Sequence, residues 1–262
     1  DGVRGTRLWY DENGRVLAFA WMNDDAVDFV CHYQHKELQD EIIEWSEEER
    51  LKNVKEKIVN CLYIFDCDKE GESIAKRKGY RKSEIFNYYG KRDLTKPTPK
   101  AQLPFGYTIK SIETEEEIRR RAEMNELAGN EITSDKYKYF MKHAVNYRQE
   151  LDLIAVAPNG DIAGFCTVWY DGICKVGMFE PYAVPFDHLR RGIGRSLLLE
   201  GMSRLLALGC SAVYVTHAGL DSDEIDPALA LNESVGFSKV ASNYMWFKHL
   251  RWLFGLYNPR DK

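Results

Sequence analysis

The stretch Leu189-Arg-Arg-Gly-Ile-Gly194 joins an apolar run to a helical pattern and decides how the surrounding chain folds. Before it, Met178-Phe-Glu-Pro-Tyr-Ala-Val184 is strand-like, and its proline cannot donate to a neighbouring strand, which marks an irregular position. After it, leucine and methionine recur at helical spacing until Gly209. A strand, a glycine loop and a helix in this order predict an anion site at the helix N-terminus.

The loop suits a phosphate group for two reasons. The first turn of a helix leaves backbone N–H groups unpaired, and Gly192 and Gly194 lack the Cβ atoms that would hold a phosphate away. Arg190, Arg191 and Arg195 add charge attraction. Since each hydrogen bond to a charged acceptor contributes about 1.5 to 3 kcal/mol, several together can hold a pyrophosphate.

Residues 178–237 resemble the GNAT superfamily of acyl-CoA-dependent N-acyltransferases. The family loop has the pattern Gln/Arg-x-x-Gly-x-Gly/Ala, and Leu189 stands where Gln or Arg is usual. The Glu180-Pro181 step and the ending Ser234-Val-Gly-Phe237 also match the family. With the flanking strands, the resemblance extends from about Phe105 to Phe247 and implies acetyl-CoA as the acyl donor.

The chain of 262 residues is expected to hold two domains. Three prolines between Leu94 and Pro104 favour an extended connector. We therefore expect a degenerate GNAT-like domain at 1–94, a linker at 95–104 and a catalytic GNAT domain at 105–262. The predicted fold is α/β, with two GNAT-like domains, each a mixed, mostly antiparallel twisted sheet flanked by helices, the first one incomplete.

Matching signals in the two halves suggest an internal duplication. Asn13-Gly14 and Asn159-Gly160 each separate strand-like runs, and a helix-glycine-aromatic ending occurs at Gly79-Tyr80 and at Gly236-Phe237. The alternative is that such signals recur in unrelated α/β proteins. The first half has no glycine where the loop should be, at 32–41. We expect that it does not bind acyl-CoA, and that it forms a wall of the acceptor cleft or the surface of a homodimer.

The resemblance implies a set of residues that bind the coenzyme. They come from the strand before the loop, the loop itself and the last helix. These residues are Tyr182, Ala183, Val184, Leu189, Arg190, Arg191, Gly192, Ile193, Gly194, Arg195, Ser196 and Asn232.

A catalytic base is expected because an alkylammonium with a pKa near 10.4 is neutral only about once in a few thousand molecules at pH 7. The family pattern places Glu180 in that role, and the alternative is a structural carboxylate paired with an arginine. Many members protonate the leaving thiolate with a tyrosine in the last helix. Asn232 stands there instead and cannot act as an acid, although its amide can hydrogen-bond the coenzyme.

Other candidates for proton transfer are Tyr244 and Tyr214, for which the alternative is ordinary packing. The thiolate can also leave unprotonated, since a thiol has a pKa of about 8.5. His217 follows a strand at 212–216 and is a base, a substrate contact or a structural histidine. His188 caps the loop or contacts phosphate. Neither histidine has neighbours spaced as metal ligands, so no metal is predicted.

Composition narrows the partners. A net charge of −5 disfavours nucleic acid, and no apolar run reaches the roughly 20 residues of a membrane span. The six cysteines form no CxxC pair, and no export signal is evident, so we expect a cytoplasmic protein. The carboxylates at 221–226 either attract a cationic amine or begin a helix, with Asp226 as its cap.

These observations predict an N-acetyltransferase that moves an acetyl or short acyl group from acyl-CoA to a primary amine of a small molecule by direct transfer. The alternative is a non-catalytic acyl-CoA-binding sensor or scaffold. This alternative would explain why the last helix lacks the tyrosine.

Overall fold

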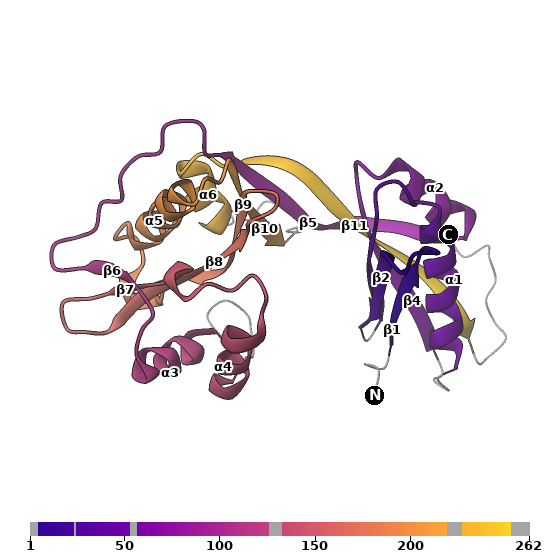
Figure 1. Cartoon of the computed structure of the whole chain (residues 1–262), viewed down its shortest axis with the longest axis horizontal. Helices are drawn as coiled ribbons and strands as arrows, with labels where there is room; N and C mark the ends of the chain where they lie inside the picture. Colours follow the sequence, from indigo (N-terminus) through magenta and orange to yellow (C-terminus); the bar gives the residue numbers. More distant parts are fainter. Residues whose placement is uncertain (1–4, 24, 53–56, 126–132, 219–226, 253–262) are drawn as a thin grey trace. The chain divides into compact units, whose positions relative to one another are not determined.

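A computed structural model describes residues 5–23, 25–52, 57–125, 133–218 and 227–252 (Figure 1). The chain divides into two compact units, Asp1–Tyr88 with Ala241–Lys262, and Tyr89–Val240. The helices and strands in chain order are β1 Thr6–Tyr10, β2 Val16–Met22, β3 Ala26–Cys31, α1 Leu38–Leu51, β4 Lys57–Phe65, α2 Lys69–Arg77, β5 Arg81–Asp93, β6 Thr108–Ser111, α3 Glu115–Glu123, α4 Ser134–His143, β7 Asp152–Val156, β8 Ile162–Asp171, β9 Val176–Ala183, α5 Ile193–Ala207, β10 Ala212–Ala218, α6 Pro227–Ser234 and β11 Ser238–Trp252.

The second unit is a mixed sheet with helices on both faces. Its strands lie in the order β10-β9-β8-β7-β6, and the end of β5 lies beside β10. The pairs β6–β7, β7–β8 and β8–β9 are antiparallel, whereas β9 and β10 are parallel and are connected through α5. In Figure 1, α5 and α6 lie on one face of this sheet and α3 and α4 on the other. This is the α/β architecture that the sequence predicts.

Helix α5 packs closely on β9 because each of the two elements has a glycine where the other element's side chain lies. A Cβ at Gly201 would come within 2.7 Å of the Phe179 ring, and one at Gly177 would overlap the Leu205 side chain. Leu198, Met202 and Leu205 of α5 are fully buried in this core. The contact fixes the N-terminus of α5 relative to the end of β9.

The first unit repeats part of this succession, because β1, β2, β3, α1, β4 and α2 follow one another as β7, β8, β9, α5, β10 and α6 do. Its strands lie in the order β1-β2-β3-β4-β11, with β3 and β4 parallel and α1 between them in the chain. The hairpin β1–β2 forms around Gly14 as predicted, with a φ of 77° at that glycine. The repeated order agrees with the expected duplication.

The division between the units differs from the predicted one. Strand β11 pairs antiparallel with β4, from Asn243 opposite Phe65 to Trp252 opposite Lys57. The residues from Ala241 onward therefore belong to the first unit, and not to a domain at 105–262. The reason is that Trp246, 1% exposed, is buried in the core cluster of the first unit.

The proline-containing segment forms neither a helix nor a strand, and it is packed on the second unit. Leu94 is 2% exposed within its main core cluster, and the Leu94 N–H donates to the Ser211 carbonyl over 2.9 Å. The Gln102 carbonyl accepts a hydrogen bond from Ser196 of α5. The segment thus contributes backbone to the region around the glycine loop.

Candidate active site

The glycine loop leads from β9 into the first turn of α5. Gly192 is the residue before the helix, with a φ of 77°, and Arg190 also has a positive φ of 56°. No acidic residue lies in the first turn of α5. Ile193 is buried at 1% exposure and anchors the turn in the core. The backbone geometry and the charge both favour an anion here.

The two predicted glycines have different roles. A Cβ at Gly192 would meet only the Gln102 carbonyl oxygen, 3.9 Å away, so open space borders the loop. A Cβ at Gly194 would lie 3.0 Å from a Leu231 methyl and 3.4 Å from a Val184 methyl. Gly192 therefore leaves room for a ligand, whereas Gly194 allows α5 to pack against α6 and the end of β9.

The basic side chains beside the loop are held by a tyrosine that the sequence analysis missed. Arg191 donates to the Tyr107 hydroxyl over 3.1 Å, and this hydroxyl lies 3.2 Å from Nδ1 of His188. Arg190 and Leu189 are exposed, and Arg195 is partly exposed. His188 thus contacts Tyr107, as a cap of the loop would.

Strands β9 and β10 separate just beyond their parallel ladder. The last paired residues are Phe179 and Val215. On its other edge β9 pairs with β8, but the register shifts between Cys166 and Val168, so that β9 bulges at Glu180 and Pro181. The segment that contains Tyr182 and Ala183 therefore borders a gap on the β10 side, where an extended ligand can pair with the backbone.

Glu180 lies at the point where the strands separate. Its Oε2 accepts a hydrogen bond from the Thr216 hydroxyl over 2.9 Å. Burial raises the pKa of the Glu180 carboxyl, and the bond from Thr216 opposes that shift. Within the described part of the chain, Glu180 forms no ion pair with arginine or lysine. The structure there does not support the alternative in which Glu180 is a structural carboxylate paired with an arginine. A carboxylate in this setting is a suitable base.

A second polar group lies on the α6 side of the same opening. Asn232 Nδ2 is 2.6 Å from the Tyr182 hydroxyl and 2.9 Å from His217 Nε2. Asn232 is fully buried and His217 is 5% exposed. Among the described residues the Asn232 Oδ1 has no hydrogen-bond partner. This buried acceptor fits a ligand that brings an N–H or S–H group into the gap between the strands.

Tyr244 belongs to the first unit, whereas Glu180 and the glycine loop belong to the second. It lies on β11 opposite Ile64, and it packs against the core cluster of the first unit. Lys82 stacks over its ring at 3.6 Å. The prediction treated β11 as part of the catalytic domain, and the pairing of β11 with β4 places Tyr244 in the other unit.

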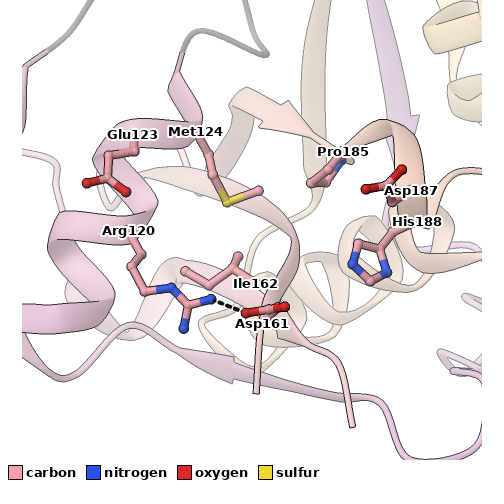
Figure 2. A pocket seen from close by; sticks show the side chains of 8 residues that line it. All are labelled: Arg120, Glu123, Met124, Asp161, Ile162, Pro185, Asp187 and His188. Atoms are coloured by element: carbon pink, nitrogen blue, oxygen red, sulfur yellow. Dashed lines mark hydrogen bonds and ion pairs between the residues drawn. The ribbon is translucent and has the colours of Figure 1, made fainter. Parts of the chain in front are cut away.

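A cavity of about 430 Å³ opens next to the loop on the α3 side (Figure 2). In Figure 2, Arg120 points toward Asp161, with which it forms an ion pair of 2.8 Å, while Asp187 and His188 lie on the segment before α5. The lining residues are Arg120, Glu123, Met124, Asp161, Ile162, Pro185, Asp187 and His188. Its three carboxylates disfavour a pyrophosphate, which leaves the backbone of the loop as the better phosphate site.

The corresponding place in the first unit is unsuited to an anion. Helix α1 begins after Glu37 and carries Asp40 and Glu41 in its first turn. The Lys78 ammonium lowers the pKa of the Asp40 carboxyl, so that this group is charged at neutral pH. The carboxylates in this first turn disfavour an anion at the N-terminus of α1.

Three further expectations concern the acidic segment at 221–226, metal binding and membrane-spanning helices. The carboxylates at 221–226 lie outside the described residues. No group of three or more His, Cys, Asp or Glu side chains that could hold a metal ion occurs in the described ranges. Likewise, no helix in the described ranges has both the length and the apolar character needed to cross a membrane.

Comparison with known proteins gives matches at the level of structure. No family model matches the sequence. No curated protein matches it either. Two solved structures align with a TM-score of 0.70 over 95% of this chain. One is a GCN5-related N-acetyltransferase from Sphaerobacter thermophilus, 19% identical and covered over 81% of its length. The other is a tandem GNAT protein from the clavulanic acid biosynthesis pathway, 17% identical and covered over 85%.

A GNAT acetyltransferase from Colwellia psychrerythraea also aligns, with a TM-score of 0.62, 10% identity and coverage of 93% of this chain and 85% of that chain. The fold is therefore that of the GCN5-related N-acetyltransferases. In particular, the chain is similar along nearly its whole length to a protein that carries this fold in tandem.

Proposed function

We propose that this protein is an acyl-CoA-dependent N-acyltransferase, whose second unit moves an acetyl or other short acyl group to a primary amine. The observation that carries the proposal is the line of groups along β9. The open loop at Gly192, the unpaired edge at Tyr182 and the carboxylate of Glu180 follow one another toward the interior of the sheet. An acyl-CoA has its pyrophosphate, its pantetheine and its thioester in the same order.

The residues present fit such a donor. The backbone N–H groups of the first turn of α5 would bind the pyrophosphate, and Arg190, Arg191 and Arg195 would add charge attraction. The Asn232 Oδ1 would accept a hydrogen bond from the pantetheine or its thiol. Acetyl-CoA supplies the activated thioester.

Glu180 acts as the base in this proposal. It takes a proton from the acceptor ammonium, and the neutral amine nitrogen then attacks the thioester carbonyl carbon. A new C–N bond forms as the C–S bond breaks, and the thiolate leaves with the electron pair. The amine gives up its second proton, which neutralises the thiolate. The raised pKa of Glu180 brings its basicity closer to that of the substrate.

Replacing Glu180 by glutamine tests this assignment. We expect kcat/KM for the amine to fall by about 10²- to 10⁴-fold, the usual contribution of general base catalysis. The KM for acetyl-CoA should change little, because Glu180 does not bind the phosphates. The assay is release of free thiol from acetyl-CoA with a panel of primary amines.

The stability of the same variant serves as the control. Because burial raises the pKa of Glu180 in the folded state, the wild type loses stability as the pH rises through that pKa, whereas Glu180→Gln does not. The melting temperature of the variant should therefore equal or exceed that of the wild type at pH 7. Activity of Glu180→Gln within twofold of the wild type would contradict the proposed base. Binding of acetyl-CoA without turnover of any amine would identify the sensor alternative.

A further inference from the structure

A second cavity in the Tyr89–Val240 unit, of about 420 Å³, lies on the face of the sheet away from α5. Four of its side chains form a row across four strands, Tyr89 on β5, Tyr214 on β10, Met178 on β9 and Trp169 on β8. The register pairs Tyr214 with Met178 and Met178 with Trp169. The cavity is lined by Tyr89, Asn146, Trp169, Tyr170, Asp171, Val176, Gly177, Met178 and Tyr214.

Alternation along the strands shows which way this row faces. Val213 and Val215, on either side of Tyr214, are buried in the core against α5. A Cβ at Gly90, next to Tyr89, would meet Val215 at 2.9 Å. Since neighbouring strand residues point to opposite faces, the row faces the side that carries α3 and α4.

The row lies beside Glu180. Met178 precedes Glu180 by two residues on β9, and Tyr214 precedes Thr216 by two residues on β10, which corresponds to about 7 Å along a strand. The Trp169 indole donates to the Glu180 carbonyl over 2.6 Å, which holds its ring against this part of β9. The glycine loop follows β9 on the other side of Glu180. The cavity is thus placed to hold the body of the molecule whose amine reaches the carboxylate.

The chemistry of the cavity selects against a polycation. Among the lining residues the one carboxylate, Asp171, accepts hydrogen bonds from the backbone N–H groups of Ile173 and Cys174. A cation borders the row, with the Lys91 ammonium 5.8 Å from the centre of the Tyr214 ring. Apolar and aromatic faces suit a flat apolar body, and the cation at the border disfavours an acceptor that carries several positive charges.

We propose that the acyl acceptor is a primary arylalkylamine, with its ring in the row formed by Tyr89, Tyr214, Met178 and Trp169 and its amine on a short spacer at Glu180. This inference rests on the proposed function and names the class of its second substrate. A volume of about 420 Å³ is sufficient for a phenyl or indole ring. Stacking against aromatic side chains supplies the affinity, and the spacer bridges the distance to the carboxylate.

The first experiment is an acceptor panel with the full chain and acetyl-CoA, and the assay is thiol release. We expect kcat/KM for 2-phenylethylamine and tryptamine to exceed the values for propylamine and spermidine by at least about tenfold. A preference for spermidine, or equal rates for propylamine and 2-phenylethylamine, would overturn the inference while the proposed function stands. Failure of every amine would instead count against the proposed function.

The second experiment locates the selectivity. Tyr214→Ala should raise the KM for 2-phenylethylamine by at least about tenfold and leave the KM for propylamine and acetyl-CoA nearly unchanged. Tyr139→Ala, at an exposed tyrosine of α4, is the matched control and should change none of these values. If Tyr214→Ala folds poorly, Tyr214→Phe and Tyr214→Leu separate the ring from the hydroxyl. Selectivity unchanged in the leucine variant would overturn the inference.

Discussion

Glu180 shows how a single side chain acquires its chemistry from two neighbouring strands. The bulge of β9 brings the carboxylate to the opening, and β10 supplies the Thr216 hydroxyl as its hydrogen-bond partner. Burial alone would favour the neutral acid, whereas the hydroxyl stabilises the charged form. The net result is a pKa above the ordinary value of a glutamate, and therefore a more basic carboxylate.

Thr216→Val tests this balance. Valine has nearly the same shape but cannot donate a hydrogen bond, so the pKa of Glu180 should rise further. Because the ionised form is active, the lower limb of the profile of kcat/KM against pH should move to higher pH. Thr216→Ser, which retains the hydroxyl, should return the profile toward that of the wild type. A limb that stays in place, or moves to lower pH, would contradict the role of Thr216 as a positioning residue.

The sequence predicted the local parts of the site and missed those that come from afar. The Glu180-Pro181 step, the glycines and Asn232 belong to patterns that are readable over a few residues. Tyr107 and Gln102 reach the loop from segments more than 80 residues earlier, and no local pattern marks them. Nothing in the sequence indicated that Asn232, His217 and Tyr182 would meet.

A buried polar cluster connects α3 and α4 to the sheet in the second unit. Asp152 on β7 accepts hydrogen bonds from Tyr137, Tyr147 and Thr167, and Arg121 of α3 lies 3.9 Å from its carboxylate. Arg121 and Asp152 are both completely buried. The cluster positions the two helices that border the acceptor face of the sheet.

Asp152→Asn should destabilise the protein by about 3 to 5 kcal/mol, because it leaves the Arg121 charge buried without compensation. The measurement is chemical denaturation followed by fluorescence or circular dichroism. The matched control is Asp161→Asn, which breaks the partly exposed pair with Arg120 and should cost less than about 1 kcal/mol. If both substitutions lowered the free energy of unfolding by the same amount, the buried pair would not stabilise the protein more than the exposed one.

At the scale of elements, the helices and hairpins follow from short-range signals. The Asn-Gly turns and the glycine after α5 each mark an end of an element in the place where the structure has it. The pairing partner of β11 does not follow from such signals. The apolar residues of β11 could pack in either unit. Only the burial of Trp246 in the core of the first unit shows that β11 belongs there.

At the scale of the whole molecule, the first unit is built from two separate segments of the chain, and the second unit is one continuous segment between them. The first unit takes in Ala241–Lys262, so a fragment that ends before this segment loses a strand of its sheet. A fragment that begins at residue 105 keeps the glycine loop but loses the strand segment that ends β5. Functional experiments therefore require the full chain.

Trp246→Ala should destabilise the first unit by about 3 to 5 kcal/mol, the usual cost of removing a large buried aromatic side chain. The loss should appear in thermal unfolding as a lowered transition. Val240→Ala, at a residue of β11 that is 52% exposed, is the control and should have a small effect. A small effect of Trp246→Ala would mean that β11 does not complete the core of the first unit.

The most direct test of the account is calorimetric titration of the full chain with acetyl-CoA. We predict one site per chain with a Kd of about micromolar order, and binding weakened at least about tenfold in Gly192→Val, whose side chain would enter the open space beside the loop. Gly209→Val is the matched control, since Gly209 has a similar φ of 80° at the other end of α5. Binding equal in the two variants, two sites per chain, or no binding by the wild type would contradict the assignment of the loop as the coenzyme site.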